Sequence, residues 1–350
     1  MRKIDFEPKN IIVRMPNWIG DIVMATPVLT DIKTKYPNSA LTVMCKAPIC
    51  EILQYDEDID ELYCFTKQAT KLFERRKETK NIISRLKQGG YDLGVLLTNS
   101  FSSAWWFWQG GVKNIIGYDC NLRNMLLSYP VKRSENHEKE HQVVFYKKLL
   151  APLGIEVSDT FPRLHMSDKE LNNAKTLLYQ RGYKEGSPLI GINPTASFGP
   201  AKCWPKERFR EIIQKLIEEK NCYVVCFGDI SSVDLVKEVC WGLSDKVINL
   251  AGVTSICELV SVIQLCDVLL TNDSGPMHIA AAVKTPLIAL FGSTNRHKTG
   301  PYKHGKVIQK NVACSPCYLK VCPIDFRCMK RIAVEEVLQA ITDALEKKNV

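Results

Sequence analysis

Strand-like and helical segments alternate along this chain, and the alternation begins twice. In the first series, apolar strand-like runs cover residues 11–15, 41–45 and 93–97, and a helical pattern covers residues 22–35. The second series has strand-like runs at residues 189–193, 222–227, 247–250, 268–271 and 287–291. Strands that alternate with helices form parallel sheets covered by helices. The pattern therefore predicts two α/β domains, each a doubly wound, Rossmann-like unit.

The length of the chain, 350 residues, agrees with two domains. A single hydrophobic core rarely organises more than about 250 to 300 residues. A polar stretch over residues 162–188 separates the two series, so we expect one domain over residues 1–170 and a second over residues 171–332. Residues 333–350 carry an amphipathic pattern and are predicted to form a C-terminal helix. Ser255 and Glu258 form the pattern of a capping box and predict a helix start there.

The composition indicates an ordinary folded protein without a membrane-spanning segment. The most apolar run, residues 277–291, is interrupted by Lys284 and Pro286. It is shorter than the roughly 20 residues that cross a bilayer. The N-terminus has no secretory pattern, so we expect a cytoplasmic protein. Many of the 14 cysteines lie inside strand-like runs, which favours reduced thiols over disulfides.

The net charge of +9 favours an anionic partner. Nucleic acid, phospholipid headgroups and an acidic sugar would all be attracted to such a charge. The sequence contains no zinc finger, helix-turn-helix or RNA-binding motif. We therefore expect no nucleic-acid partner.

Three polar loops directly follow strand-like runs. In a doubly wound sheet, ligands bind outside the carboxyl ends of the strands, so these loops are the candidate functional segments. The sequence of residues 272–278 is Asn-Asp-Ser-Gly-Pro-Met-His, and a helical pattern follows. Because Gly275 has no side chain, this helix start suits a diphosphate held by backbone N–H groups and the helix dipole. The alternative is a capped turn without a ligand, since Asp or Ser followed by Pro is common at helix starts.

The other two loops contain a lysine and an aspartate. In residues 193–205, Thr195, Ser197 and Lys202 suit a pyrophosphate whose charge grows as it leaves, although a lone lysine is more often solvated. In residues 16–21, Asp21 is either a general base or a helix cap. The glycines match neither the dinucleotide fingerprint nor the P-loop, which argues against a nicotinamide dehydrogenase.

Taken together, these segments resemble glycosyltransferase family 9, the ADP-heptose:lipopolysaccharide heptosyltransferases. The resemblance extends over nearly the whole chain, and it is strongest toward the members that add the second heptose. It rests on Trp18-Ile19-Gly20-Asp21, Asn99 to Ala104, Ile116-Gly117-Tyr118, Phe198 to Pro205, Leu250-Ala251-Gly252 and Asn272 to Ala282.

The resemblance implies a GT-B fold, in which two Rossmann-like domains face a central cleft. It implies an N-terminal domain that binds the lipopolysaccharide inner core, Kdo-lipid A carrying a heptose. It implies a C-terminal domain that binds ADP-L-glycero-β-D-manno-heptose, and a transfer that inverts the anomeric carbon. Transfer of the first or third heptose is the alternative within the family. Neither a cofactor nor a metal is expected.

The resemblance also assigns roles to individual residues. Asp21 is the expected general base, and Lys202 is expected to stabilise the departing diphosphate. The expected donor-binding residues are Thr195, Lys202, Asp229, Gly252, Thr254, Asp273, Ser274, Gly275 and His278. The expected acceptor-binding residues are Asn17, Ser100 and Ser103.

Two rival functions belong to other classes. A nucleotide-sugar epimerase of the same architecture would need further acid–base residues around the sugar. An inactive membrane-associated scaffold would have no use for Asp21, Lys202 and Asp273 together. We also expect peripheral attachment to the inner face of the inner membrane, because basic residues are in excess and Trp105, Trp106 and Trp108 lie close together. The alternative for these tryptophans is a buried helix.

Two further patterns resemble metal sites. Cys314, Cys317, Cys322 and Cys328 begin with the spacing of a zinc site, so a structural metal remains the alternative to our expectation of none. The acidic run from Asp56 to Asp60 resembles a metal-binding Asp-x-Asp motif. It lies in a polar turn, where we expect solvated carboxylates.

Overall fold

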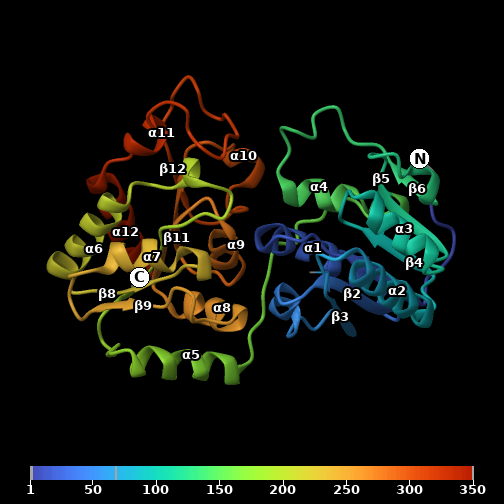
Figure 1. Ribbon diagram of the computed structural model, residues 1–350, viewed down its shortest axis with the longest axis horizontal. Coiled ribbons are helices and arrows are strands. Elements are labelled where there is room, and N and C mark those ends of the chain that lie inside the picture. The colour runs from blue at the N-terminus through green and yellow to red at the C-terminus, as the bar shows by residue number, and fades with distance from the viewer. Residues whose placement is uncertain (1–2, 68, 349–350) are drawn as a thin grey trace. The chain divides into compact units, whose positions relative to one another are not determined.

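The computed structural model describes residues 3–67 and 69–348. The chain divides between Leu164 and His165 into two compact units (Figure 1). Each unit has one six-stranded sheet in which every strand pair is parallel. The prediction of two Rossmann-like α/β sheets is therefore confirmed.

The first unit has the strand order β3-β2-β1-β4-β5-β6. Its strands are β1 (Asn10–Arg14), β2 (Ala40–Lys46), β3 (Glu61–Phe65), β4 (Leu93–Leu96), β5 (Asn114–Tyr118) and β6 (Tyr129–Val131). Its helices are α1 (Ile19–Lys35), η1 (Ile49–Leu53), α2 (Leu72–Gly89), α3 (Phe101–Gln109), η2 (Asn124–Leu126), α4 (Gln142–Lys148) and η3 (Ala151–Leu153). The chain order reverses between β1 and β4, which is the usual position of a ligand site in this class of fold.

The second unit repeats this topology with the order β9-β8-β7-β10-β11-β12. Its strands are β7 (Leu189–Asn193), β8 (Tyr223–Cys226), β9 (Val247–Asn249), β10 (Val268–Asn272), β11 (Leu287–Phe291) and β12 (Lys306–Gln309). Its helices are α5 (Asp168–Gln180), η4 (Pro200–Lys202), α6 (Lys206–Lys220), η5 (Ile230–Ser232), α7 (Val233–Cys240), α8 (Ile256–Leu265), α9 (Gly275–Ala282), α10 (Arg296–Thr299), α11 (Arg327–Lys330) and α12 (Val334–Lys348). The predicted capping box of Ser255 and Glu258 is present at the start of α8.

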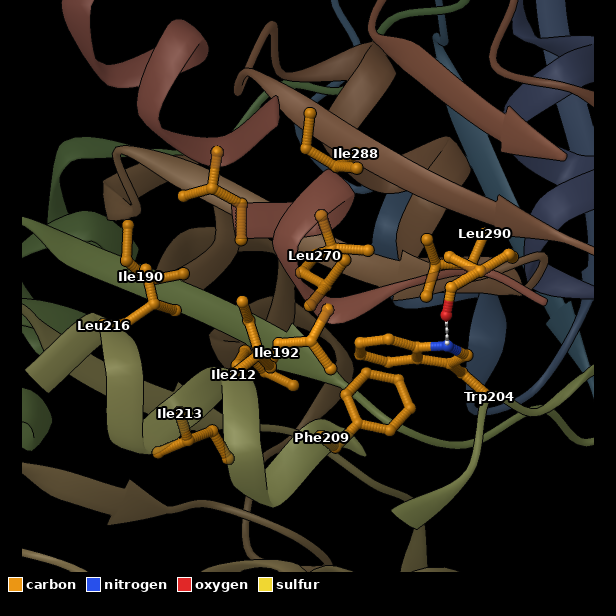
Figure 2. Close-up of a cluster of buried hydrophobic side chains, with 14 of the residues drawn as sticks. Ile190, Ile192, Trp204, Phe209, Ile212, Ile213, Leu216, Leu270, Ile288 and Leu290 are labelled. Atoms are coloured by element: carbon orange, nitrogen blue, oxygen red, sulfur yellow. Dashed lines mark hydrogen bonds between the residues drawn. The ribbon is translucent and has the colours of Figure 1, made fainter. Parts of the chain in front are cut away.

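Each unit has its own hydrophobic core. In the first, Phe65, Trp106 and Phe107 pack with strand residues such as Ile12 between the sheet and the helices α2 and α3. In the second, Trp204 and Phe209 lie edge to face, with ring centroids 5.1 Å apart, among aliphatic side chains of the central strands (Figure 2). Helix α12 packs against α6, β10 and β11, so it is part of the second unit.

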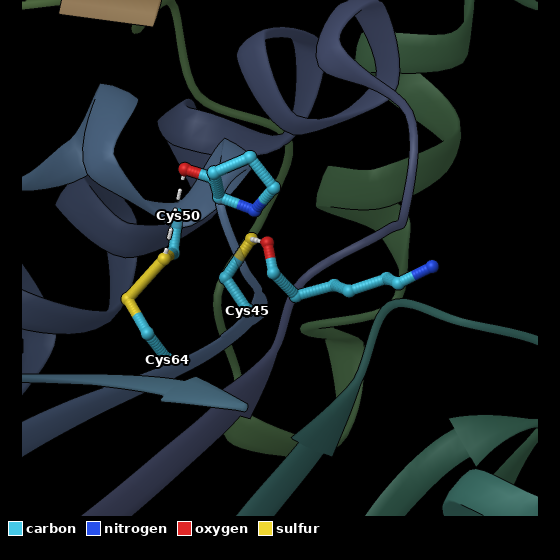
Figure 3. Close-up of a disulfide and its surroundings, with 5 residues drawn as sticks. Cys45, Cys50 and Cys64 are labelled. Atoms are coloured by element: carbon cyan, nitrogen blue, oxygen red, sulfur yellow. Dashed lines mark hydrogen bonds between the residues drawn. A yellow bond between two sulfur atoms is a disulfide. The ribbon is translucent and has the colours of Figure 1, made fainter. Parts of the chain in front are cut away.

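One disulfide contradicts the prediction of reduced thiols. Cys50 on η1 and Cys64 on β3 are bonded (Figure 3). Their Cα atoms lie 5.8 Å apart, which is within the usual range for a disulfide. Strand β3 was not among the predicted strands, so no predicted element placed Cys64 close to Cys50. Cys45, on the neighbouring strand β2, is free and buried.

The acidic turn also differs from its prediction. Asp56 is buried rather than solvated, and Oδ1 of Asp56 lies 2.9 Å from the Arg163 guanidinium. Asp60 lies 2.7 Å from the Lys33 ammonium. These carboxylates therefore tie loops and helices of the first unit together. None of the described helices combines the length and the apolar character needed to cross a bilayer.

Candidate active site

Lys202 and Asp273 form a nearly buried ion pair in the second unit. Nζ of Lys202 lies 2.6 Å from Oδ2 of Asp273, and the two side chains are 13% and 4% exposed. The same carboxylate oxygen accepts a hydrogen bond from the hydroxyl of Thr294 at 2.5 Å. The ring of Phe198 lies 4.9 Å from the ammonium. The alternative of a lone, solvated Lys202 is therefore wrong.

The loop that carries Lys202 is held in place by its neighbours. The backbone N–H of Trp204 donates to Oδ1 of Asn272 at 3.0 Å, and the indole N–H donates to the carbonyl of Ile332 at 3.1 Å (Figure 2). Gly199 has a φ of 147°, and a Cβ there would lie 2.5 Å from the carbonyl oxygen of Lys320. The loop therefore requires glycine at this position.

Helix α9 begins beside this ion pair, directly after β10. Ser274 is its N-cap residue, but the Ser274 side chain accepts no hydrogen bond from the helix. The hydroxyl instead donates to the carbonyl of Asn272 at 3.1 Å and accepts from the amide of Asn193 at 2.9 Å. Gly275 adds no side chain. The positive end of the α9 dipole is thus not capped by Ser274, which suits an anionic ligand.

Asn193, which the sequence did not single out, connects two of the predicted residues. Its buried amide nitrogen donates to the carbonyl of Thr195 at 2.9 Å, as well as to Ser274. The Thr195 hydroxyl in turn donates to Oδ1 of Asn193 at 3.2 Å. The ends of β7 and β10 are held together in this way. His278 lies buried within α9.

Asp229, Gly252 and Thr254 lie in the loops after β8 and β9. Partial burial acts to raise the pKa of Asp229, but hydrogen bonds from Ser232 and Ser231 lower it below its ordinary value. The N–H of Gly252 donates to the carbonyl of Gly228 at 2.9 Å, which brings the two loops side by side. Thr254 is half-buried.

Asp21 lies in the first turn of α1 in the first unit, but it does not cap the helix. The N-cap residue is Trp18, whose side chain makes no capping bond. Oδ1 of Asp21 accepts a hydrogen bond from the hydroxyl of Tyr146 on α4 at 3.0 Å. Burial and the Asp21 charge raise the pKa of Tyr146 well above its ordinary value, so Tyr146 remains a proton donor to Asp21.

The predicted acceptor residues follow β1 and β4, which are neighbouring strands: Asn17 and Ser100 precede the helices α1 and α3, and Ser103 lies in the first turn of α3. Asn17 is exposed, and its Oδ1 accepts from the Arg14 guanidinium at 2.6 Å. Ser100 caps α3, since its hydroxyl accepts from the N–H of Ser103 at 3.3 Å. Ser103 itself is buried.

The comparisons with known proteins decide the family. The model of glycosyltransferase family 9 (heptosyltransferase) matches residues 80–326, which is more than half of the chain. The chain belongs to glycosyltransferase family 9. Within family 9, it is similar to lipopolysaccharide heptosyltransferase 2 of Escherichia coli K12, with 31% identity over 84% of this chain and 86% of that protein. It is also similar to lipooligosaccharide heptosyltransferase 2 of Campylobacter jejuni, with 29% identity over 95% of this chain and 98% of that protein.

A solved family 9 structure agrees with the fold. The structure of E. coli ADP-heptose lipopolysaccharide heptosyltransferase II matches with a TM-score of 0.80 and 27% identity, over 97% of this chain and 100% of that chain. The predicted GT-B class is confirmed.

The structure also places the four cysteines near the C-terminus and the three neighbouring tryptophans. Cys314, Cys317, Cys322 and Cys328 are free, and among residues 3–67 and 69–348 no group of three or more His, Cys, Asp or Glu residues is placed to hold a metal ion. Of the three tryptophans, Trp106 is buried and Trp108 is 54% exposed. Trp105 is partly buried against the core.

Proposed function

We propose that the chain transfers a heptose from ADP-L-glycero-β-D-manno-heptose to the inner core of lipopolysaccharide, where it adds the second heptose. The observation that carries the proposal is the Lys202–Asp273 pair beside the start of α9, in a chain similar to several heptosyltransferases 2. A lysine and a helix N-terminus together suit the diphosphate of a nucleotide sugar.

The proposed reaction is a single displacement at the anomeric carbon. Asp21 takes the proton of the acceptor hydroxyl as that oxygen forms a bond to the anomeric carbon. The bond from this carbon to the diphosphate oxygen breaks, and ADP leaves with the electron pair. The configuration inverts because attack and departure occur on opposite faces. The hydrogen bond from Tyr146 supports a fixed position of Asp21.

Lys202 is the proposed partner of the departing diphosphate. Negative charge grows on this group during the reaction, so a cation held nearby stabilises the transition state more than the bound donor. Ser274, Gly275 and Thr195 are the proposed cradle of the phosphates. Asp273 and His278 are proposed contacts to the diphosphate or the heptose.

The remaining contacts are assigned by the same proposal. Asp229, Gly252 and Thr254 are the proposed adenosine contacts. Asn17, Ser100 and Ser103 are proposed to contact the acceptor, Kdo-lipid A carrying a heptose. No resident cofactor, metal or nucleic acid takes part.

A peripheral position on the inner face of the inner membrane is proposed as well. It is supported by the net charge of +9 and by exposed aromatic side chains in the first unit, including Trp18, Phe101 and Trp108. Such side chains favour the boundary between water and lipid.

The test is incubation with ADP-heptose and defined acceptors, followed by mass measurement of the products. Acceptors that carry no heptose, one heptose or two heptoses separate the three activities of the family, and we expect a product only with one. Conversion of ADP-heptose to a stereoisomer without an acceptor would indicate an epimerase, and it is detected by proton NMR because an epimer has the same mass. A protein that binds ADP but forms no product with any acceptor would be the inactive scaffold.

A further inference from the structure

A buried cation, Arg14, lies at the end of β1, directly before the loop that leads to Asp21. Arg14 is 2% exposed, and burial lowers its pKa to about 10, so it is charged at neutral pH. Buried charges are costly unless they are paired. Within residues 3–67 and 69–348, no carboxylate lies within ion-pair distance of Arg14.

The groups that accept hydrogen bonds from Arg14 are neutral. Its guanidinium donates to the carbonyl of Met15 and to Oδ1 of Asn17, while its Nε atom is buried without a partner. The nearby Cys45 thiol supplies no charge, because burial raises its pKa to about 11. Among the described residues, the positive charge of Arg14 therefore has no counter-ion.

A second cation, Lys67, lies over the ring that packs against the aromatic partner of Arg14, close enough for the Arg14 charge to lower its pKa. The Arg14 guanidinium lies 4.6 Å from the ring centroid of Phe65, and the Lys67 ammonium lies 4.4 Å from that of Trp106. The two rings pack edge to face at 5.9 Å. Burial lowers the pKa of Lys67, and the charges of Arg75, Arg14 and Lys46 act in the same direction, against Glu78. The aromatic rings thus hold like charges near one another.

The hydrogen bond from Arg14 fixes what Asn17 offers to a ligand. Because the amide oxygen of Asn17 accepts from Nη2 of Arg14 at 2.6 Å, the amide NH₂ is left as a donor on an exposed side chain. A hydrogen-bond donor beside a buried cation favours an anionic oxygen over a neutral hydroxyl as its acceptor. Both groups belong to the first unit, in the segment that also carries Asp21.

We propose that Arg14, Asn17 and Lys67 form an anion-binding site for the acceptor, in which the Asn17 amide and the Lys67 ammonium contact a carboxylate or phosphate oxygen. Arg14 is a positioning residue, because its hydrogen bond orients the Asn17 amide. The inference rests on the proposed function, which supplies an acceptor with carboxylates on its acidic sugars and phosphates on its lipid. The site would hold the acceptor through a charge that is not part of the reacting hydroxyl.

The substitution Asn17→Asp separates this role from a structural one. A carboxylate at position 17 pairs with Arg14, so it should stabilise the fold while it repels the acceptor. Lys87→Gln is the matched control, because it also lowers the net charge by one and lies exposed in the last turn of α2. Acceptor affinity and ADP affinity are measured separately by calorimetry, together with the melting temperature.

We expect Asn17→Asp to weaken acceptor binding roughly tenfold or more, as for the loss of a charge-assisted hydrogen bond. Its ADP affinity should be unchanged, and its melting temperature should be equal or higher. Lys67→Gln should weaken acceptor binding to a similar degree without altering the Asn17 loop. It therefore provides the test if Asn17→Asp does not fold. Acceptor affinities of both variants equal to that of Lys87→Gln would overturn the proposal.

Two acceptor derivatives identify the anion. One has its carboxyl groups reduced to alcohols, and the other has its phosphates removed. The derivative that lacks the recognised group should bind the wild-type protein weakly. Its affinity for Asn17→Asp should be no lower than its affinity for the wild type. If both derivatives bind like the parent acceptor, the anion site is overturned. These binding measurements use no ADP-heptose, so they do not depend on catalysis. If the wild-type protein binds the acceptor as expected but forms no product with ADP-heptose, the proposed function is overturned and the anion-binding site is not.

Discussion

The Oδ2 atom of Asp273 accepts a hydrogen bond from the Thr294 hydroxyl and also forms the ion pair with the Lys202 ammonium. The three side chains therefore form one hydrogen-bonded group. A diphosphate that binds Lys202 has to compete with this carboxylate. If Lys202 turned toward such a diphosphate, Thr294 would remain as a hydrogen-bond partner of Asp273. At the scale of residues, the pair is a structural contact, and under the proposed function its lysine is also the cation that binds the diphosphate of the donor.

Removal of the lysine separates these two roles. Lys202→Ala should weaken ADP binding and lower turnover, and it should also cost up to about 3 kcal/mol of stability, because Asp273 is left buried without its cation. The double variant Lys202→Ala with Asp273→Asn should recover most of that stability but none of the turnover. Calorimetry with ADP and urea unfolding of both variants test this. Wild-type ADP affinity in Lys202→Ala would exclude a diphosphate contact.

The other residue-scale prediction concerns Asp21. Asp21→Asn keeps an oxygen that can accept from the Tyr146 hydroxyl, so the free energy of unfolding should change by less than about 1 kcal/mol. It removes the proton acceptor, and turnover should fall by about 10²- to 10⁴-fold while ADP-heptose still binds. Single-turnover rates and a melting curve are measured together. Near-wild-type turnover in a folded variant would show that Asp21 is not the base.

At the scale of elements, the long buried strands were the predictable part of the fold. Strands β7 and β11 have the predicted bounds, because continuous apolar runs mark strands covered on both faces. Strands β6 and β12 lie at sheet edges, are short and are partly exposed, so their sequences show no such run. The sequence therefore predicts the centre of each sheet better than its rim.

The same limit applies to the candidate site. Lys202, Asp273 and Asp21 stand out because each lies in a polar segment that follows a strand-like run. Thr294 and Tyr146 are single polar residues whose partners are 21 and 125 positions away. No local pattern relates such residues, and only the packing of the elements brings them together. Arg14 was missed for a different reason: a charged residue at a strand end is usually solvated, whereas this one is buried.

One glycine tests how strictly the loop before Lys202 is fixed. Gly199→Ala places a Cβ against the backbone of Lys320, which cannot move aside like a side chain. Gly186→Ala is the control, since Gly186 also has a positive φ but faces open space. Both variants should lose about 1 to 2 kcal/mol from backbone strain, and only Gly199→Ala should also bind ADP more weakly. Equal ADP affinities would mean that the loop adapts without moving Lys202.

At the scale of the whole molecule, the two units have separate cores and carry different candidate residues. The proposed base and acceptor contacts lie in the first unit, and the proposed diphosphate contacts lie in the second. The net charge of +9 belongs to the chain as a whole and gives it a general attraction to anionic surfaces. The exposed Trp18, Phe101 and Trp108 add apolar contact area to the first unit.

Vesicle binding tests the proposed membrane attachment. The protein should sediment with vesicles that contain anionic phospholipid at low salt, and the bound fraction should fall as salt rises, because charges are screened within about 8 Å at physiological ionic strength. Vesicles of neutral phosphatidylcholine serve as the control and should bind less. Failure to bind anionic vesicles at low salt would mean that the acceptor is reached without attachment.

The pairing of Lys202 with Asp273 has a consequence for the end of the catalytic cycle. After transfer, ADP carries more charge on its terminal phosphate than the donor did, so an isolated lysine would hold the product tightly and slow the next turnover. If Lys202 binds the diphosphate as proposed, Asp273 competes with ADP for the ammonium, and the hydrogen bond from Thr294 holds the carboxylate in place for this competition. The pair should therefore limit product inhibition, so that Asp273→Asn has a lower inhibition constant for ADP than the wild type in steady-state kinetics.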